Sequence, residues 1–290
     1  MATFIADPEF VRSARAIDPV TNVAERMDTS SLAVSFLRVV RSEWVKFRSL
    51  QANWITMLAA AVLMLGVGAL SAAFLNGTIG GGGDGFADTT DPTTVSLSGM
   101  QLAQIVVGIL GVLAITSEFA NGMIRATFAA VPKRLPVLWA KAIVVAGVTV
   151  AVMLPTVFAT FFIAQVILGG DQNASLSDDG VLRSLIGSAG LLSAIGLLGL
   201  GLGSILRQAA GAIGSLFVFF LIAPGLLGLV LPASIEDATL KYLPSNAGSA
   251  FTTIGSTQSL LSPAVGALVV VGWVAAFLGI AAVLLKRRDA

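Results

Sequence analysis

The sequence contains no cysteine and no histidine, and few of its residues are charged. The chain therefore forms no disulfide, offers no thiolate or imidazole to a metal, and cannot build a Ser-His or Cys-His catalytic pair. Only 11% of the 290 residues are charged, against about 25% in soluble domains. Because 56% are hydrophobic, the composition is typical of a membrane protein with several spans. The net charge of +1 gives no indication of a nucleic-acid partner.

Six apolar runs are long enough to cross a hydrocarbon layer of about 30 Å, which takes about 20 helical residues. We expect an all-helical membrane protein with spans near residues 52–75, 100–116, 138–168, 184–206, 212–231 and 264–285. The third run is longer than the bilayer requires, so this helix must tilt or project beyond it. Pro155 and the pair Pro224-Gly225 predict kinks in the third and fifth spans. Gly199 and Gly203 permit close helix packing, which we expect within the chain rather than between two chains.

The distribution of lysine and arginine predicts the orientation in the membrane. If the N-terminus is inside, fifteen of the seventeen basic residues fall in inner segments, and only Arg183 and Lys241 fall outside. We therefore expect both termini in the cytoplasm. The first residues lack the basic start and apolar core of a cleavable signal peptide, so the first span would act as its own insertion signal.

Three segments outside the spans have distinct patterns. Residues 1–30 are polar and of mixed charge, and we expect a mobile cytoplasmic tail. Residues 31–50 predict a basic amphipathic helix in the membrane interface, the alternative being a cytoplasmic extension of the first span. Its apolar side would carry Leu37, Val40, Trp44 and Phe47, with Arg38, Arg41 and Arg48 elsewhere. Residues 233–260 are too apolar for a disordered loop, which favours short helices folded back into the outer leaflet over a compact surface loop.

The segment 117–141 joins the second and third spans on the inner side. Read as a helix, it places Glu118, Asn121 and Arg125 on a narrow polar stripe, with apolar residues on the remainder. Pro132 cannot continue such a helix. Two cations follow where they favour a helix C-terminus, Lys133 and Arg134. The segment is either a loop that only turns the chain or a docking element that receives force from a soluble partner.

The spans themselves are nearly free of ionisable side chains. Ion-coupled carriers generally bury such groups near mid-membrane, and acid–base catalysis needs them, so both classes are disfavoured. Gln101 and Gln104 share one face near the outer end of the second span and are the best candidates to line a cavity. Phe217 and Phe220 in the fifth span contact lipid or form an apolar wall for a substrate. The motif GxxxxGK[ST] is absent, so active transport would need energy from a separate chain.

The topology and two sequence stretches together resemble the permease subunits of bacterial ATP-binding-cassette exporters of the type-2 class. The stretches are RSEWVKFRSLQANW and SEFANGMIRATFAAVPKRLPVLWAKA, and the resemblance covers about residues 35–288. Members of this class show an acidic residue at the inner end of the second span, then Gly, an Ile-Arg or similar pair, and Pro followed by Arg. The matching residues here are Glu118, Gly122, Ile124-Arg125, Pro132 and Arg134, with Lys141 opening the third span and Met123 replacing a common Thr.

The resemblance implies that residues 118–134 form a coupling helix on an ATPase subunit. The coupling residues would be Glu118, Asn121, Gly122, Arg125 and Arg134. It also implies that the outer helices cap an exit path and that substrate leaves through a cavity between the second and fifth spans. That cavity would be lined by Gln101, Gln104, Phe217 and Phe220.

The resemblance further implies an assembly in a bacterial cell membrane. Two ATP-binding subunits would carry ATP and Mg, so this chain itself would have no cofactor, no metal and no catalytic residue. A second permease, which we expect to be a copy of the same chain, would complete the path through the lipid bilayer. The membrane part spans residues 52–288, and nucleic acid is not an expected partner.

Three functions follow from these patterns. The first is the membrane subunit of an ATP-driven exporter that moves an amphipathic drug, peptide or lipid-like molecule out of the cell. The second is a non-transporting anchor or sensor that only tethers an ATPase. The third, an ion-coupled carrier, is disfavoured by the uncharged spans.

Overall fold

The computed structural model describes residues 35–79, 91–131, 133–169, 173–230, 239–254 and 261–287. Within these ranges the chain is helical and contains no strand. The predicted tail at 1–30 lies outside the described residues, as do residues 231–238 and 255–260 at the flanks of the predicted outer helices.

Six helices of the described chain are long and apolar enough to cross a membrane, which confirms the predicted number of spans. They are α4 (Gln51–Leu75), α6 (Met100–Ala120), α8 (Leu135–Leu168), α9 (Val181–Leu206), the segment Ala209–Val230, and α14 (Pro263–Arg287).

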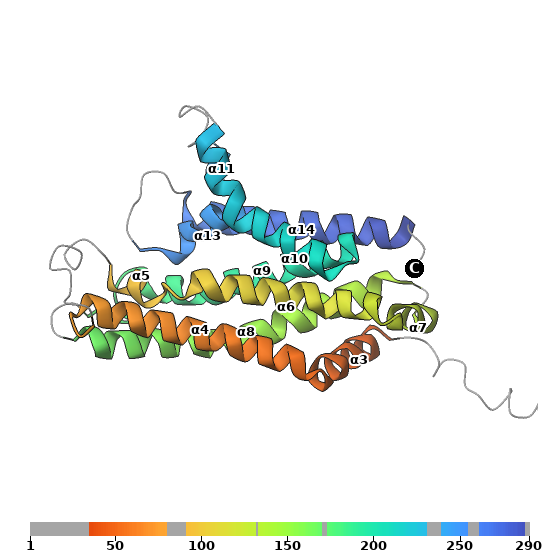
Figure 1. Cartoon of the computed structure of the whole chain (residues 1–290), viewed down its shortest axis with the longest axis horizontal. Coiled ribbons are helices and arrows are strands. Elements are labelled where there is room, and N and C mark those ends of the chain that lie inside the picture. Colours follow the sequence, from red (N-terminus) through yellow and green to blue (C-terminus); the bar gives the residue numbers. More distant parts are fainter. Residues whose placement is uncertain are drawn as a thin grey trace, which may run out of the picture.

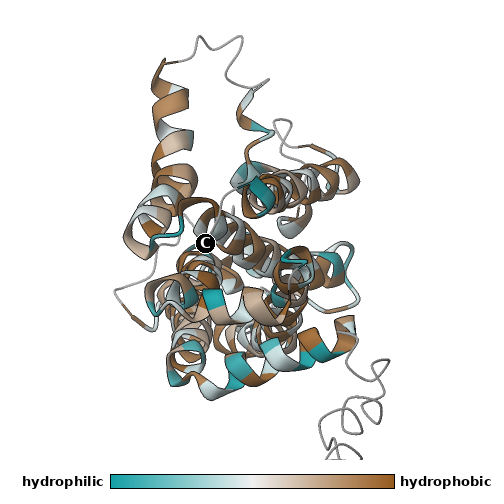
Figure 2. Cartoon of the chain, turned by 90° about the vertical axis from the view of Figure 1, so that its right-hand side faces the viewer, coloured by the Kyte–Doolittle hydropathy of each residue, from teal (hydrophilic) through white to brown (hydrophobic). Residues whose placement is uncertain are grey.

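The long helices lie side by side in one bundle, and the short helices lie at its two ends (Figure 1). The helix α9 packs on α6, α8 and α14, so it occupies the centre. At one end lie α3 (Phe36–Ser49), α7 (Met123–Ala130) and the last turn of α14. At the other end lie α5 (Pro92–Ser96) and α13 (Pro244–Thr252). Figure 2 looks onto the first end, where hydrophilic residues gather on short helices and helix ends while the long helices are mainly hydrophobic.

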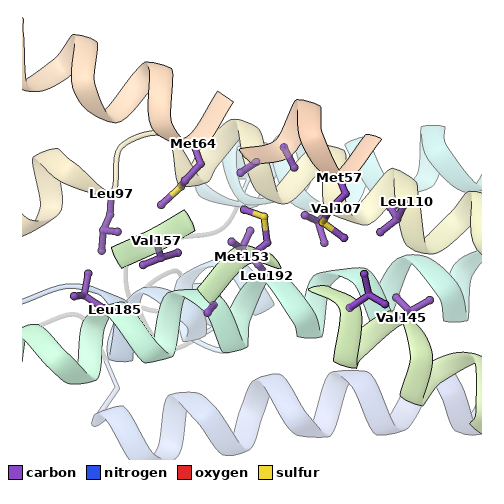
Figure 3. Close-up of a cluster of buried hydrophobic side chains, with 14 of the residues drawn as sticks. Met57, Met64, Leu97, Val107, Leu110, Val145, Met153, Val157, Leu185 and Leu192 are labelled. Atoms are coloured by element: carbon purple, nitrogen blue, oxygen red, sulfur yellow. The ribbon is translucent and has the colours of Figure 1, made fainter. Parts of the chain in front are cut away.

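The main core lies between α4, α6, α8 and α9 and consists mainly of aliphatic and methionine side chains (Figure 3). Its buried residues include Met57, Met64, Val107, Leu110, Val145, Met153, Val157, Leu185 and Leu192. The pair α6 and α9 approaches most closely through glycines. A Cβ atom on Gly199 would overlap the carbonyl oxygen of Gly108, and one on Gly111 would overlap that of Gly196. The prediction that the small residues of the fourth span pack within the chain is therefore confirmed for Gly199.

The fifth span is not one continuous α-helix. It consists of α10 (Ala209–Phe217), a π-helical turn (Val218–Ile222) and α11 (Ala223–Val230). Pro224 has no N–H for the carbonyl four residues earlier, and its ring crowds that carbonyl, so the preceding turn widens. The helix α11 projects away from the bundle (Figure 1), and none of its residues is buried. The predicted interruption near Pro224-Gly225 is thus confirmed.

The third span extends further than the bilayer requires. With 34 residues, α8 is about 51 Å long at a rise of about 1.5 Å per residue. The helix continues through Pro155, where the sequence predicts a kink, without a change of helix type. Its first turns lie at the end of the bundle that carries α3 and α7 (Figure 1).

Two local features differ from the sequence predictions. The segment read as one helix from residue 117 is divided, because α6 continues to Ala120 and a new helix begins at Met123. Gly122 between them has a φ of 67°, a left-handed conformation that glycine adopts without strain. The short helix α5 was not predicted. The outer helix α13 begins at Pro244, where the missing N–H of proline is tolerated in the first turn.

Candidate functional site

The helix α7 forms the surface between the second and third spans. Its Ile124 and Phe128 are buried and pack in one hydrophobic cluster with Val39 of α3, Leu138 of α8 and Leu285 of α14. The opposite side carries Met123, 41% exposed, together with exposed Asn121, Gly122 and Arg125. The element therefore packs on α3, α8 and α14 on its inner side and is open on its outer side.

A cluster of four charged side chains lies directly behind α7. Lys141 of α8 places its Nζ 2.5 Å from Oε2 of Glu43 and 2.7 Å from Oε1 of Glu118. Lys46 of α3 places its Nζ 2.7 Å from Oε1 of Glu43 and 3.3 Å from Oε1 of Glu118. Lys46 also donates to the Oγ1 of Thr127 on α7, at 3.2 Å. The cluster joins α3, α6, α7 and α8 and has no net charge.

Three of the four charges are almost completely removed from solvent. Glu43, Glu118 and Lys141 are 2%, 3% and 5% exposed. Each charge has at least one opposite charge within hydrogen-bond distance, which buried ions require. The second oxygen of Glu118, Oε2, is buried and has no hydrogen-bond partner among the described residues. Beside it lies a cavity of about 20 Å³ lined by Glu43, Lys46, Glu118 and Lys141 among others, large enough for about one water molecule.

Lys46 differs from its partners because its side chain is 23% exposed. Burial lowers the pKa of Lys46, but the hydrogen bond and charge of Glu43 and the charge of Glu118 more than offset this. The pKa of Lys46 therefore lies above its ordinary value of 10.5. The ammonium form is the one that the cluster stabilises.

A groove runs between α3 and α7 beside the cluster. Its volume is about 450 Å³, and its walls are Arg38, Val39, Ser42, Glu43 and Lys46 of α3 with Ala126, Thr127, Ala130 and Val131. The groove combines an apolar floor with basic side chains at the end of the bundle.

The predicted coupling residues occupy different environments. Glu118 lies inside the charge cluster and not on the surface. Arg134 is partly buried, donates to the carbonyl of Leu285 at 3.2 Å and lies over the ring of Phe128. Asn121, Gly122 and Arg125 are exposed, and no interaction of the Arg125 side chain is seen within the described part of the chain. The role of all five in coupling to an ATPase stays a prediction.

Sequence reasoning did not find Glu43, Lys46 and Thr127. Glu43 is the only acidic residue of α3 and is spaced four residues from both Val39 and Phe47. Because these two are buried, Glu43 shares the face that packs on the bundle. Two residues expected on the apolar side, Leu37 and Trp44, are 76% and 40% exposed and do not face the bundle. The isolated glutamate at helical spacing from apolar residues was the available signal.

The predicted substrate residues separate into two places. Gln101 and Gln104 line a cavity of about 330 Å³ at the end of the bundle that carries α5 and α13. Phe217 and Phe220 do not line this cavity. Phe220 is buried, 6% exposed, against α9 and neighbouring helices. Phe217 is 36% exposed on the outside of the fifth span. The structure thus brings the two glutamines together and places the phenylalanines elsewhere.

The comparisons with known proteins identify the family. The family described as ABC-2 family transporter protein matches residues 39–225, which is well over half of the chain and includes α4 to α10 and the charge cluster. No curated protein sequence matches the chain. Together with six membrane-spanning helices, the match shows that the chain belongs to the ABC-2 family of transporter proteins and is a multi-pass membrane component of an ABC transporter.

Proposed function

We propose that this chain is the permease subunit of an ATP-driven exporter, moving an amphipathic drug, peptide or lipid-like molecule out of a bacterial cell. The observation that carries the proposal is α7, a short helix exposed on one side and joined on the other to the ends of two spans. Such an element can receive a displacement and pass it to the membrane helices. The spans carry ionisable side chains only near their ends, such as Glu118 and Lys141, so their mainly apolar length suits an amphipathic cargo rather than ion coupling at mid-membrane.

The charge cluster would transmit movement from α7 and α3 to the spans. Lys141 belongs to α8 and Glu118 to the end of α6, and both contact residues of the peripheral helix α3. In a low-dielectric setting, separating these partners would leave unpaired buried charges. The four helices would therefore move as a unit when α7 is pushed, rather than slide past one another.

The assembly that we propose contains two ATP-binding subunits, which hold ATP and Mg, and a second copy of this permease. The ATP-binding subunits would contact the exposed side of α7 and the groove between α3 and α7. This end of the bundle would face the cytoplasm, since it carries α3, α7 and the end of α14 (Figure 1) and the basic residues of the positive-inside pattern. The opposite end, with α5 and α13, would face outward, with α13 folded against the outer leaflet.

The test is reconstitution with the ATP-binding subunit that co-purifies with the tagged chain. Arg125→Glu reverses an exposed charge on α7 and should reduce both the amount of bound ATPase subunit and ATP-dependent efflux from vesicles. Asp179→Arg is the matched control, because Asp179 is an exposed charge in the connection before α9. Equal loss in both variants, or ATPase binding without any ATP-dependent efflux, would reject the exporter and favour a non-transporting anchor.

A further inference from the structure

The cavity beneath α13 has a lining of unusual chemistry. Nine of its twelve described lining residues are polar, and none is charged. They come from α5, the turn before α6, the start of α6, and α13, so two outer helices and a span contribute. They are Thr94, Ser98, Gln101, Gln104, Ser245, Asn246, Ser249, Thr252 and Thr253, with Leu97, Met100 and Leu191 as the apolar remainder.

Most hydroxyl protons of the lining are already used within the protein. Thr94 donates to Asp91, Ser98 to Ser71, Ser249 to the carbonyl of Ser245, Thr252 to that of Gly248 and Thr253 to that of Ser249. A hydroxyl group has one proton but two lone pairs. These five oxygens can therefore only accept further hydrogen bonds from a molecule in the cavity.

The lining also contains three amides, Gln101, Gln104 and Asn246, each of which can both donate and accept hydrogen bonds. Gln104 donates through Nε2 to Oε1 of Gln101 at 2.7 Å, and Asn246 donates through Nδ2 to the carbonyl of Leu240 at 3.0 Å. The carbonyl oxygen of Gln104 makes no hydrogen bond within the described part of the chain, although Gln104 is only 7% exposed. A nearly buried acceptor that faces a polar cavity is a site for a donor.

The charge of the lining restricts the ligand further. A phosphate or carboxylate would find no basic side chain among the lining residues to compensate its burial. A quaternary ammonium has no donor, and any cation would lack a carboxylate among the lining residues to compensate its burial. The volume of about 330 Å³ is near the lower limit of about 300 Å³ for small-molecule sites. The cavity therefore suits one compact polar group rather than a whole drug-sized molecule.

We propose that this cavity binds an uncharged group with several hydroxyls, such as a sugar ring, on the molecule that the transporter exports. The proposal rests on the proposed function for its cargo, but the binding itself does not require an ATPase. The apolar part of the molecule would remain outside the cavity, along the exposed faces of the spans. A water-soluble glycoside and a glycolipid headgroup share this chemistry.

The experiment uses the full chain alone in phosphatidylcholine nanodiscs, with methyl β-D-glucopyranoside as the probe and saturation-transfer NMR as the readout. We expect saturable binding of the glucoside and none of tetramethylammonium or methyl sulfate. Gln104→Met keeps the side-chain size but removes the acceptor, and should weaken glucoside binding about three- to tenfold, the worth of one hydrogen bond. Gln165→Met is the matched control, because Gln165 is equally buried, 7% exposed, and bonds instead to Ser96 and Ala174.

A second variant keeps the test decisive if Gln104→Met does not fold. Thr253→Val removes one lining hydroxyl at a partly exposed position and should also weaken binding. Nanodiscs that contain glucosyl diacylglycerol separate the two sources: competition with the glucoside supports a lipid headgroup, and unchanged binding supports a water-soluble molecule. No saturable binding by the wild type, equal binding of tetramethylammonium, or equal weakening by Gln165→Met would overturn the proposal. Since no ATPase is present, failure here leaves the exporter proposal standing, and loss of export leaves this site standing.

Discussion

Lys141 of the third span contacts both buried glutamates, Glu43 and Glu118, and replacing it by Met removes both contacts. In the wild type, its Nζ lies 2.5 Å from Glu43 and 2.7 Å from Glu118. After the substitution, both carboxylates stay buried and share only Lys46, at 2.7 Å and 3.3 Å. The thioether fills most of the lysine volume, so the change concerns charge rather than packing.

The magnitude follows from the burial of the partners. Removing one partner of a buried ion pair costs about 3–5 kcal/mol, because the other charge is left uncompensated. Lys46 still offers a partial partner here, so we expect the lower end, about 3 kcal/mol, or roughly a hundredfold in the folded-to-unfolded ratio. Replacing Glu43 and Glu118 by Gln together with Lys141→Met removes all three buried charges and should recover most of this loss.

The assay is reversible unfolding of the purified chain by SDS in mixed micelles, followed by tryptophan fluorescence. Lys286→Met is the matched control, because Lys286 is an exposed lysine in the last turn of α14. The reasoning is refuted if Lys141→Met unfolds at the same SDS fraction as this control. It is also refuted if the triple variant is no more stable than Lys141→Met alone.

Three further outcomes follow from the structure. The pKa of Lys46 is raised above 10.5 in the folded protein. Its contribution to the free energy of unfolding is therefore complete below pH 10.5 and is lost as the pH rises through the higher folded pKa. Lys46→Met should flatten the alkaline part of a curve of stability against pH, and an unchanged curve would contradict this. Gly199→Ala should lower unfolding stability by about 1–3 kcal/mol through overpacking against α6, whereas Gly147→Ala, where a Cβ meets nothing within 4 Å, should not. Pro224→Ala restores a backbone donor, so amide exchange in residues 218–222 should slow; exchange as fast as in the wild type would show that the π-turn has another cause.

Hydropathy was sufficient to predict the six spans, because each span needs about 20 mainly apolar residues to cross the hydrocarbon layer whatever its neighbours are. The bend of the fifth span was equally predictable, since the missing N–H of Pro224 acts locally. The helix α5 also had a local signal that was not used: Asp91 accepts from the backbone N–H of Thr94 at 2.8 Å, and Pro92 occupies the first turn.

The charge cluster was beyond sequence reasoning because it depends on four helices meeting. Periodicity placed Glu118 on a polar stripe with Asn121 and Arg125, but α6 ends at Ala120 and the left-handed Gly122 separates Glu118 from Arg125. Glu118 then points toward Lys141 and the α3 residues, which is a consequence of packing and not of local pattern. Gln101 and Gln104 lie three residues apart on one helix, so the sequence could place them together at a cavity. The contribution of α13 to that cavity depends on packing and was not predicted.

The account depends most on α7 being the inward-facing contact for an ATP-binding subunit. The chain has no cysteine, so Met123→Cys on α7 and Asp179→Cys at the other end of the bundle each introduce a single thiol. In intact cells, the account predicts that Asp179→Cys reacts with a membrane-impermeant maleimide, and that Met123→Cys is protected and crosslinks to the ATP-binding subunit. Labelling of Met123→Cys from outside, or crosslinking to that subunit only from Asp179→Cys, would contradict it.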